Sequence, residues 1–335
     1  MNIMKRIIVP LLLLASIVLM CFGISGCTST AENTKIVLSE VTHSVFYAPQ
    51  YVAINLGYFE EEGLDIELIN GGGADKVMTS VISGEAQIGL AGPEAAVYVY
   101  NQGNPNYSIV FAQLTQRDGA FLVSRSKIDN FSWDMLKGKY VIGGRVGGVP
   151  EMTFEHVLAL KGIDKSKDIT LDTSIAFALT AGAFTGGTGD FVTLFEPTAS
   201  SLEQRGQGYV VASIGENSGY IPYTAFFASK EYIEANPEII QKFTNAIYKG
   251  QQYCATHTAE EIASVVLPSF PDTDMAILTS SIARYMSIDA WCTDPIMEEE
   301  SLNALLEIME EAEELDARPV YSDMVDTEYA TKAIK

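Results

Sequence analysis

The sequence predicts an α/β protein of two doubly wound domains, or lobes, joined by two crossover strands. Between residues 35 and 94, short apolar runs alternate with segments of helical periodicity, a pattern typical of parallel strands connected by helices. The same alternation starts again after residue 119. Two polar, glycine-containing segments, 114–119 and 215–223, interrupt it and indicate where the chain crosses between the lobes.

The first lobe is organised around strands that are each followed by a helix. One helix is predicted to begin at Pro49, a preferred first-turn residue, and the next to end at Gly84. Because parallel strands end at one edge of a sheet, the loops after them should gather there and form a ligand pocket. The strands are predicted at 36–38, 66–69 and 88–90, and these loops at 42–48, 70–75 and 91–94.

The second lobe repeats this alternation before the chain returns to the first lobe. Lobe two is predicted to span 119–221, and lobe one to combine 35–118 with 222–335. After residue 229 the chain is predicted to be helical, with acidic runs at 298–300 and 310–314 as solvated helix faces beside an apolar stripe. The remaining strands are predicted at 107–113, 120–124, 140–142, 169–172, 191–195, 209–213 and 224–229, and helices at 133–136, 152–161, 174–184 and 198–205.

The N-terminus has the features of an export signal. Basic residues precede an apolar run from 7 to 22, which is shorter than the ~20 residues that a membrane-spanning helix needs. The run leads into Ile-Ser-Gly-Cys27, which resembles the cleavage site of a bacterial lipoprotein precursor. We therefore expect removal of residues 1–26, lipidation of Cys27 and a polar tether at 27–34; an uncleaved membrane anchor is the alternative.

The composition is strongly acidic. The net charge of −22 becomes −24 once residues 1–26, which contain Lys5 and Arg6, are removed. Nucleic acid and anionic lipid headgroups are therefore poor partners, whereas a small anion held by local donors is not excluded. After Cys27 only Cys254 and Cys292 remain, and they could form a disulfide in an oxidising compartment or stay free thiols.

The sequence carries none of the common catalytic or cofactor motifs. A dinucleotide fingerprint, a P-loop, a zinc-protease motif and a nucleophile elbow are all missing from it. Its histidines, His43, His156 and His257, are too far apart in sequence to form a metal-binding motif. We expect no cofactor and no metal, although scattered catalytic residues would leave no such signature.

Several short segments give the chain a resemblance to a known family. They are His43-Ser-Val-Phe-Tyr-Ala-Pro-Gln, Leu56-Gly-Tyr-Phe-Glu-Glu-Glu-Gly-Leu-Asp, Ser83-Gly-Glu-Ala-Gln-Ile-Gly, Leu136-Lys-Gly-Lys, Gly189-Asp-Phe-Val and Pro237-Glu-Ile-Ile. In this order they resemble the solute-binding lipoproteins of ABC importers for nitrate, sulfonates and taurine, a branch that includes binders of thiamine pyrimidine precursors. The resemblance covers nearly all of the chain after residue 35, and it is specific to the family rather than to one substrate.

The resemblance implies the type II periplasmic-binding-protein fold, in which two lobes close on a solute about a hinge. It also implies a monomer, lipid-anchored on the outer side of the cell membrane, that delivers its solute to ABC permease subunits. A sensory lipoprotein of the same fold is an alternative. Fungal pyrimidine synthases of this family are enzymes with a cysteine-rich segment that this chain lacks, so we expect no enzymatic activity.

Candidate ligand-binding residues in the first lobe come from two of the predicted loops. The aromatic pair of the first loop could stack on a ring or surround an alkyl chain, or it could pack against the first helix. The third loop leads into a helix start, where backbone N–H groups favour negative charge. Glu94 could satisfy that terminus, or it could face the cleft, repel a sulfonate and favour an amine or an aminopyrimidine. The candidates are His43, Phe46, Tyr47, Gly92, Pro93 and Glu94.

The remaining candidates lie in the second lobe and the crossovers. Arg145, followed by glycines and a helix start, is the best anion site, and Arg117 in the first crossover is the other basic candidate. Glu196 follows a second-lobe strand and should point at the same opening. The set is Arg117, Arg145, Gly147, Gly148, Glu196 and Tyr223. The predicted ligand is a small organic anion of the sulfonate, taurine or nitrate class, with a thiamine pyrimidine precursor as the alternative.

Overall fold

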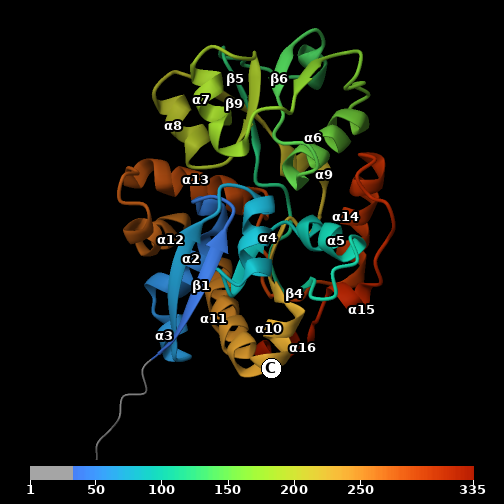
Figure 1. Ribbon diagram of the computed structural model, residues 1–335. Helices are drawn as coiled ribbons and strands as arrows, with labels where there is room; N and C mark the ends of the chain where they lie inside the picture. The colour runs from blue at the N-terminus through green and yellow to red at the C-terminus, as the bar shows by residue number, and fades with distance from the viewer. Residues whose placement is uncertain (1–32) are drawn as a thin grey trace, which may run out of the picture. The chain divides into compact units, whose positions relative to one another are not determined.

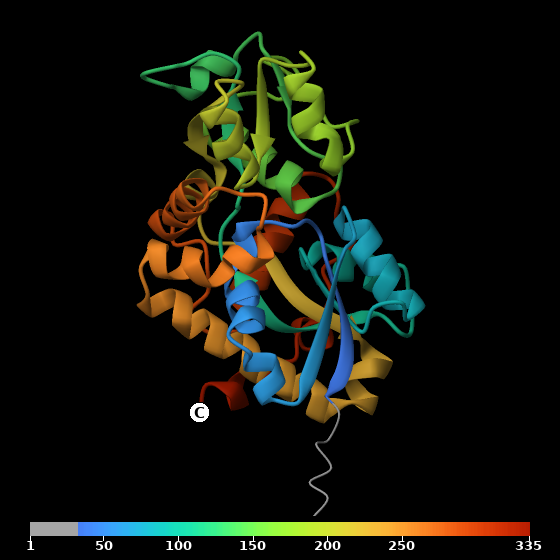
Figure 2. The same cartoon turned by 90° about the vertical axis from the view of Figure 1, so that its left-hand side faces the viewer.

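Two five-stranded β-sheets carry the fold in the computed structural model, which describes residues 33–335 (Figures 1 and 2). The predicted signal peptide, the lipidation of Cys27 and nearly all of the predicted tether lie outside these residues. Within the described range, no helix is both long enough and apolar enough to cross a membrane.

The first sheet has the strand order β2-β1-β3-β10-β4. Strand β1 pairs in parallel with β2 and β3, whereas β10 lies antiparallel between β3 and β4. Since β10 comes after all strands of the second sheet, the first sheet combines two separate parts of the chain. Its strands are β1 (Thr34–Glu40), β2 (Leu64–Asn70), β3 (Ile88–Ala91), β4 (Ser108–Thr115) and β10 (Thr224–Ser229).

The second sheet repeats this topology with the order β7-β6-β8-β5-β9. Strand β6 pairs in parallel with β7 and β8, and β5 lies antiparallel between β8 and β9. The predicted fold class, two doubly wound α/β lobes, is confirmed; the residue limits of the lobes stay a prediction. The strands are β5 (Phe121–Ser124), β6 (Tyr140–Ile142), β7 (Thr170–Asp172), β8 (Phe191–Leu194) and β9 (Tyr209–Ser213).

Helices connect the strands of both sheets, and a long helical region follows β10. Around the first sheet lie η1 (Val45–Tyr47), α2 (Ala48–Asn55), α3 (Tyr58–Glu61), α4 (Ala74–Ser83) and α5 (Glu94–Asn101). Around the second lie η2 (Trp133–Leu136), α6 (Val149–Leu160), η3 (Phe177–Leu179), α7 (Thr180–Thr185), α8 (Thr198–Gln204) and α9 (Ile214–Ser218). The C-terminal helices are α10 (Lys230–Ala235), α11 (Pro237–Thr256), α12 (Ala259–Val266), η4 (Leu267–Ser269), α13 (Met275–Ser287), α14 (Glu299–Glu311), α15 (Tyr321–Met324) and α16 (Glu328–Ala333).

Some predicted boundaries were wrong for local reasons. The helix predicted at 174–184 begins only at Phe177, because Ser174 donates its backbone N–H and its hydroxyl to Asp172 in a turn. The segment 215–223, predicted as a plain crossover, starts with helix α9, whose N-cap Ser213 accepts a hydrogen bond from the Glu216 backbone. The predicted C-terminal stripe is confirmed: the apolar residues of α14 are buried and the flanking glutamates 298–300, 310 and 311 are exposed.

The hydrophobic core of the first sheet extends toward the second. Phe121 on β5 and Val149 and Met152 on α6 are buried in the same apolar cluster as the residues of β1, β3 and β10. In Figure 1, α13 and α14 lie beside the junction of the two sheets, and α13 contacts both η1 and α8. The ends of strands from both sheets therefore meet along one packed boundary.

Candidate ligand-binding site

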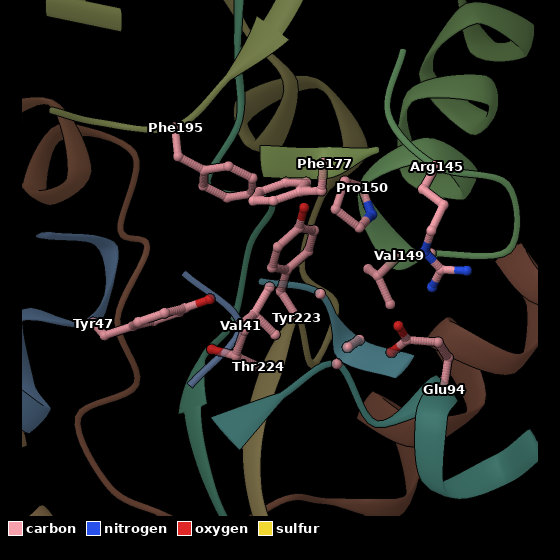
Figure 3. Close-up of a pocket in the computed structure, with 14 residues that line it drawn as sticks. Val41, Tyr47, Glu94, Arg145, Val149, Pro150, Phe177, Phe195, Tyr223 and Thr224 are labelled. Atoms are coloured by element: carbon pink, nitrogen blue, oxygen red, sulfur yellow. The ribbon is translucent and has the colours of Figure 1, made fainter. Parts of the chain in front are cut away.

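A small pocket lies where loops of the two sheets meet, and we call it the inner pocket (Figure 3). Loops after β1, β2 and β3 and the start of β10 form one side, and the start of α6, η3 and the loop after β8 form the other. Its cavity of about 40 Å³ has room for roughly three water molecules. It is lined by Val41, Tyr47, Gly73, Ala74, Gly92, Glu94, Arg145, Gly148, Val149, Pro150, Phe177, Phe195, Tyr223 and Thr224.

Glu94, the first residue of α5, is the central polar group of this pocket. Its side chain is only 1% exposed, and its Oε2 atom has no hydrogen-bond partner among residues 33–335. Burial raises the pKa of this carboxyl to about 7, although backbone N–H groups and the Arg145 charge oppose that shift. A buried carboxyl with a free oxygen and a pKa near neutrality is typical of a ligand-binding site.

Gly92 allows the Glu94 carboxyl to take this position. A Cβ atom at residue 92 would lie 2.0 Å from Glu94 Oε2 and 2.8 Å from Val149 Cγ2. Any side chain there would displace the carboxyl group, so the loop after β3 needs glycine for a steric reason.

Arg145, in the loop before α6, faces Glu94 across the pocket (Figure 3). Its Nε atom lies 3.8 Å from an Asp75 carboxylate oxygen, and its Nη1 atom donates to the Val146 carbonyl at 3.0 Å. The Arg145 side chain is 39% exposed, so water solvates much of its charge. The pocket therefore holds one buried carboxyl and one half-solvated guanidinium.

Aromatic rings form the other walls. Phe177 and Phe195 lie with their ring centroids 5.5 Å apart, and Tyr223 lies 6.1 Å from Phe195. The Tyr47 and Tyr223 phenols are buried, and this burial raises their pKa values well above the usual range, so both stay neutral. The Tyr223 hydroxyl lies near the buried Asp118 carboxyl, whose charge adds to the effect of burial on the pKa of this phenol.

The structure brings six of the predicted candidates into this pocket and leaves the others outside. Phe46 is fully buried behind it and packs on Tyr285 of α13, whereas the packing alternative had named the first helix as its partner. His43 bonds to the Glu40 carboxylate and the Ser269 carbonyl, which holds its loop to the C-terminal region. The candidates in the pocket are Tyr47, Gly92, Glu94, Arg145, Gly148 and Tyr223.

Three more candidates also lie outside the inner pocket. Arg117 stacks on the Tyr220 ring at 3.9 Å and donates to the Gly215 carbonyl. Its guanidinium therefore contacts the second crossover segment. Pro93 is the N-cap residue of α5, and Gly147 borders a neighbouring cavity. For these residues, ligand contact stays a prediction.

Glu196 does not point into the inner pocket, contrary to the expectation from its place after β8. Its carboxylate accepts hydrogen bonds from the Ser200 backbone N–H and hydroxyl and from Arg284 Nη1 at 2.6 Å. The Glu196 backbone N–H donates to the Tyr285 hydroxyl. The Glu196 carboxylate thus already has hydrogen-bond partners and a cation, because the C-terminal helix α13 packs against this loop. The sequence contains no signal for that contact.

Phe177 and Phe195 are pocket residues that the sequence analysis missed. Phe177 lies in a segment that was predicted as plain helix, and Phe195 was counted as the end of a strand. Their function as walls depends on loops of one sheet facing loops of the other. No group of three or more potential metal-ligating side chains occurs among residues 33–335.

Two α/β sheets of one topology, with a pocket between their loops, form a fold typical of solute-binding proteins. The chain belongs to the NMT1/THI5-like family, whose profile matches residues 45–261. It is 45% identical over 315 residues to YtlA of Bacillus subtilis (strain 168), and the match covers 94% of each chain. The name of YtlA calls it a binding protein and does not say what it binds. The predicted family is thereby confirmed.

Two further similarities are more distant. The alkanesulfonate-binding protein SsuA of Xanthomonas axonopodis pv. citri, solved with bound MOPS, superposes with a TM-score of 0.71 at 16% identity, over 89% of this chain and 100% of that chain. At this identity the similarity shows the fold alone. A 4-amino-5-hydroxymethyl-2-methylpyrimidine phosphate synthase of Aspergillus parasiticus is 24% identical over 225 residues, 64% of each protein.

Proposed function

We propose that this protein is the extracytoplasmic, lipid-anchored binding subunit of an ABC importer, and that its solute is a small aminopyrimidine. The family, the solute-binding fold and the export-type N-terminus support the general function. Neighbouring genes for a permease and an ATPase would distinguish import from sensing. Cys27→Ala should leave an unlipidated precursor; the same lipidated product in mass spectrometry would contradict the anchor.

The observation that carries the ligand class is the free, buried oxygen of Glu94 among aromatic walls. An aminopyrimidine is flat, so Phe177, Phe195 or Tyr223 could stack on it. Its exocyclic amine is a hydrogen-bond donor, and a buried carboxylate gains most from such a donor. A sulfonate would instead bring negative charge next to a carboxyl group that burial already destabilises in its charged form.

Arg145 favours the second candidate, a small organic anion such as a sulfonate. Its guanidinium and the N-terminus of α6 line the same pocket. This support is weaker, because the guanidinium is half-solvated and lies 3.8 Å from Asp75. A zwitterion such as taurine would use both Glu94 and Arg145.

Capture would follow from opening and closing of the two lobes. Contacts already join the loops of the two sheets: Tyr98 donates to the Gly147 carbonyl at 2.9 Å, and Ser44 donates to the Glu196 carbonyl at 2.5 Å. A cavity of about 40 Å³ is far below the ~300 Å³ of a small-molecule site. The lobes must therefore separate to admit a solute, and contacts from both sides would then stabilise the closed form.

We infer binding without catalysis. YtlA, which is 45% identical to this chain, is named as a binding protein, and this supports the inference. Cys254 and Cys292 are buried, free thiols that border a different cavity. A pyrimidine synthase-like activity is the alternative, and incubation with a bound pyrimidine followed by mass spectrometry would reveal any product.

The test is a thermal-shift screen of pyrimidines, sulfonates, taurine and nitrate, followed by titration calorimetry on variants. Glu94→Gln should weaken an aminopyrimidine by roughly ten- to a hundredfold, the contribution of a charge-assisted hydrogen bond. Arg145→Ala should weaken a sulfonate by a similar factor, and Arg145→Lys should restore it incompletely if the contact is bidentate. Arg318→Ala, in an exposed ion pair with Glu310, is the control. If neither Glu94→Gln nor Arg145→Ala changes affinity by more than about threefold, the pocket assignment is wrong.

A further inference from the structure

A second cavity borders the inner pocket, and we call it the outer cavity. Its volume is about 420 Å³, roughly the size of a small-molecule site. Helices α4 and α5 and Glu314, just after α14, line one side, and the loop 145–147 lines the other. Glu94 and Arg145 border both cavities, so the two are neighbours across these side chains.

The outer cavity is rich in negative charge and in hydrogen-bond acceptors. Asp75, Glu94 and Glu314 line it, against the single cation Arg145. Asp75 lies nearest to Arg145, at 3.8 Å. Arg318, the cation nearest to Glu314 in the sequence, pairs with Glu310 instead, and Oε2 of the buried Glu94 has no hydrogen-bond partner among residues 33–335. The Glu94 and Glu314 carboxyl groups thus line this cavity without an ion-pair partner among residues 33–335.

The geometry of the loop 145–147 holds these acceptors in place. Gly147 has a positive φ of 70°, and a Cβ atom on it would lie 3.2 Å from Glu314 Oε2 and 3.5 Å from the Tyr98 hydroxyl. Glycine therefore lets Glu314 approach the loop. Tyr98 donates its proton to the Gly147 carbonyl at 2.9 Å, so the lone pairs of its oxygen remain free to accept. Burial raises the pKa of Tyr98 most, and the nearby Glu94 and Glu314 carboxylates raise it further, while Arg145 opposes the shift.

We infer that the outer cavity is a subsite for a protonated amine on the solute, with Glu314 and Glu94 as its counter-charges and Tyr98 as an acceptor. The inference rests on the proposed function: once the lobes have separated enough for the inner pocket to admit the ring, a short ammonium-bearing arm passes Glu94 into the outer cavity. An alkylammonium group stays charged at neutral pH and carries three donors, which suits this set of acceptors.

Other occupants fit less well. An anionic arm would meet Asp75 and Glu314, with only Arg145 to balance them. A metal ion is disfavoured, since the described residues contain no group of three or more side chains placed to ligate one. An apolar arm would leave the carboxylates desolvated and unpaired, which costs free energy.

The experiment compares two probes that differ only in this arm. They are 4-amino-5-hydroxymethyl-2-methylpyrimidine and its 5-aminomethyl analogue, titrated into the mature chain by calorimetry at neutral pH and low salt. The aminomethyl probe should bind about tenfold tighter than the hydroxymethyl probe. This is the lower end of the effect expected for a charge-assisted hydrogen bond, because water partly screens charges in an open cavity. In Glu314→Gln the ratio of the two affinities should fall toward one. Glu85→Gln removes an exposed carboxylate outside both cavities and should keep the ratio.

The outcomes separate the two proposals. If the probes bind equally tightly to the natural protein, or if Glu314→Gln keeps the full preference, the amine subsite is wrong and the aminopyrimidine function stands. If neither probe binds, the proposed function fails and this inference fails with it. Thermal unfolding of Glu314→Gln serves as the folding control. Added salt should reduce the preference for the aminomethyl probe, because salt screens exposed charges.

Discussion

At the scale of single residues, Glu94 connects stability to function. Its carboxyl pKa rises from 4.5 to about 7 because the side chain is buried. Between these values the folded protein keeps a proton that the unfolded chain has lost, so the free energy of unfolding falls as pH rises. A group buried for ligand binding thus makes the empty protein less stable at neutral pH.

This effect is measurable with Glu94→Gln, which removes the titrating group and keeps the shape. The contribution of Glu94 to the free energy of unfolding should fall by roughly 3 kcal/mol from pH 4.5 to pH 7. The natural protein should lose more thermal stability than the variant across that range. Other buried acids, such as Glu151, occur in both proteins and cancel in the difference. If stability changes with pH in the same way in the natural protein and in Glu94→Gln, the pKa of the Glu94 carboxyl is not raised.

Gly92 gives a second test at this scale. In Gly92→Ala the new Cβ would displace Glu94 Oε2, which now lies 2.0 Å from that position. The displaced atoms are side-chain ends, so the protein should stay folded while affinity for an aminopyrimidine falls about tenfold or more. Gly182→Ala, at a helical position with open space around it, is the matched control and should bind normally. Normal binding by Gly92→Ala would show that the carboxyl position is not required.

At the scale of elements, α13 ties the C-terminal region to the second sheet. Arg284 on this helix pairs with the buried Glu196 at 2.6 Å and with Glu203 at 2.5 Å, and Tyr285 donates to the Gly119 carbonyl. These contacts position the loop after β8, which also carries Phe195 of the inner pocket. One helix far along the sequence thus supports a wall of the site.

Arg284→Ala should therefore be costly, because it leaves the Glu196 carboxylate buried without a cation. We expect the free energy of unfolding to fall by about 2 kcal/mol in urea denaturation, less than for a fully buried pair because Arg284 is 30% exposed. Arg318→Ala breaks an exposed pair with Glu310 and should cost less than about 1 kcal/mol. Equal losses in the two variants would contradict the role assigned to α13.

At the scale of the whole molecule, ligand binding should change the separation of the lobes. The loops of the two sheets touch in this structure, yet the inner pocket holds only about 40 Å³. In small-angle scattering, the ligand-free protein should sample more open forms, and a saturating ligand should reduce the radius of gyration. An unchanged profile at demonstrated full occupancy would count against a hinge.

The sequence by itself determined the alternation of strands and helices, the family and six of the fourteen residues that line the inner pocket. Apolar periodicity, glycines and prolines act locally, so β1, β3, β6 and β9 and the start of α5 were predictable within a residue or two. Glu94 was identifiable because it stands at the start of a predicted helix that follows a strand, and Arg145 because it lies in the glycine-containing loop before another predicted helix.

Only the tertiary structure decided which of these residues face one another. Glu196 and Glu94 occupy equivalent places after strands, yet Arg284 on α13 neutralises the first and no cation lies within ion-pair distance of the second in residues 33–335. The aromatic walls and the outer cavity also arise from contacts between loops of the two sheets. Such contacts depend on how whole lobes pack, and burial and charge pairing between distant segments leave no periodic signal in the sequence.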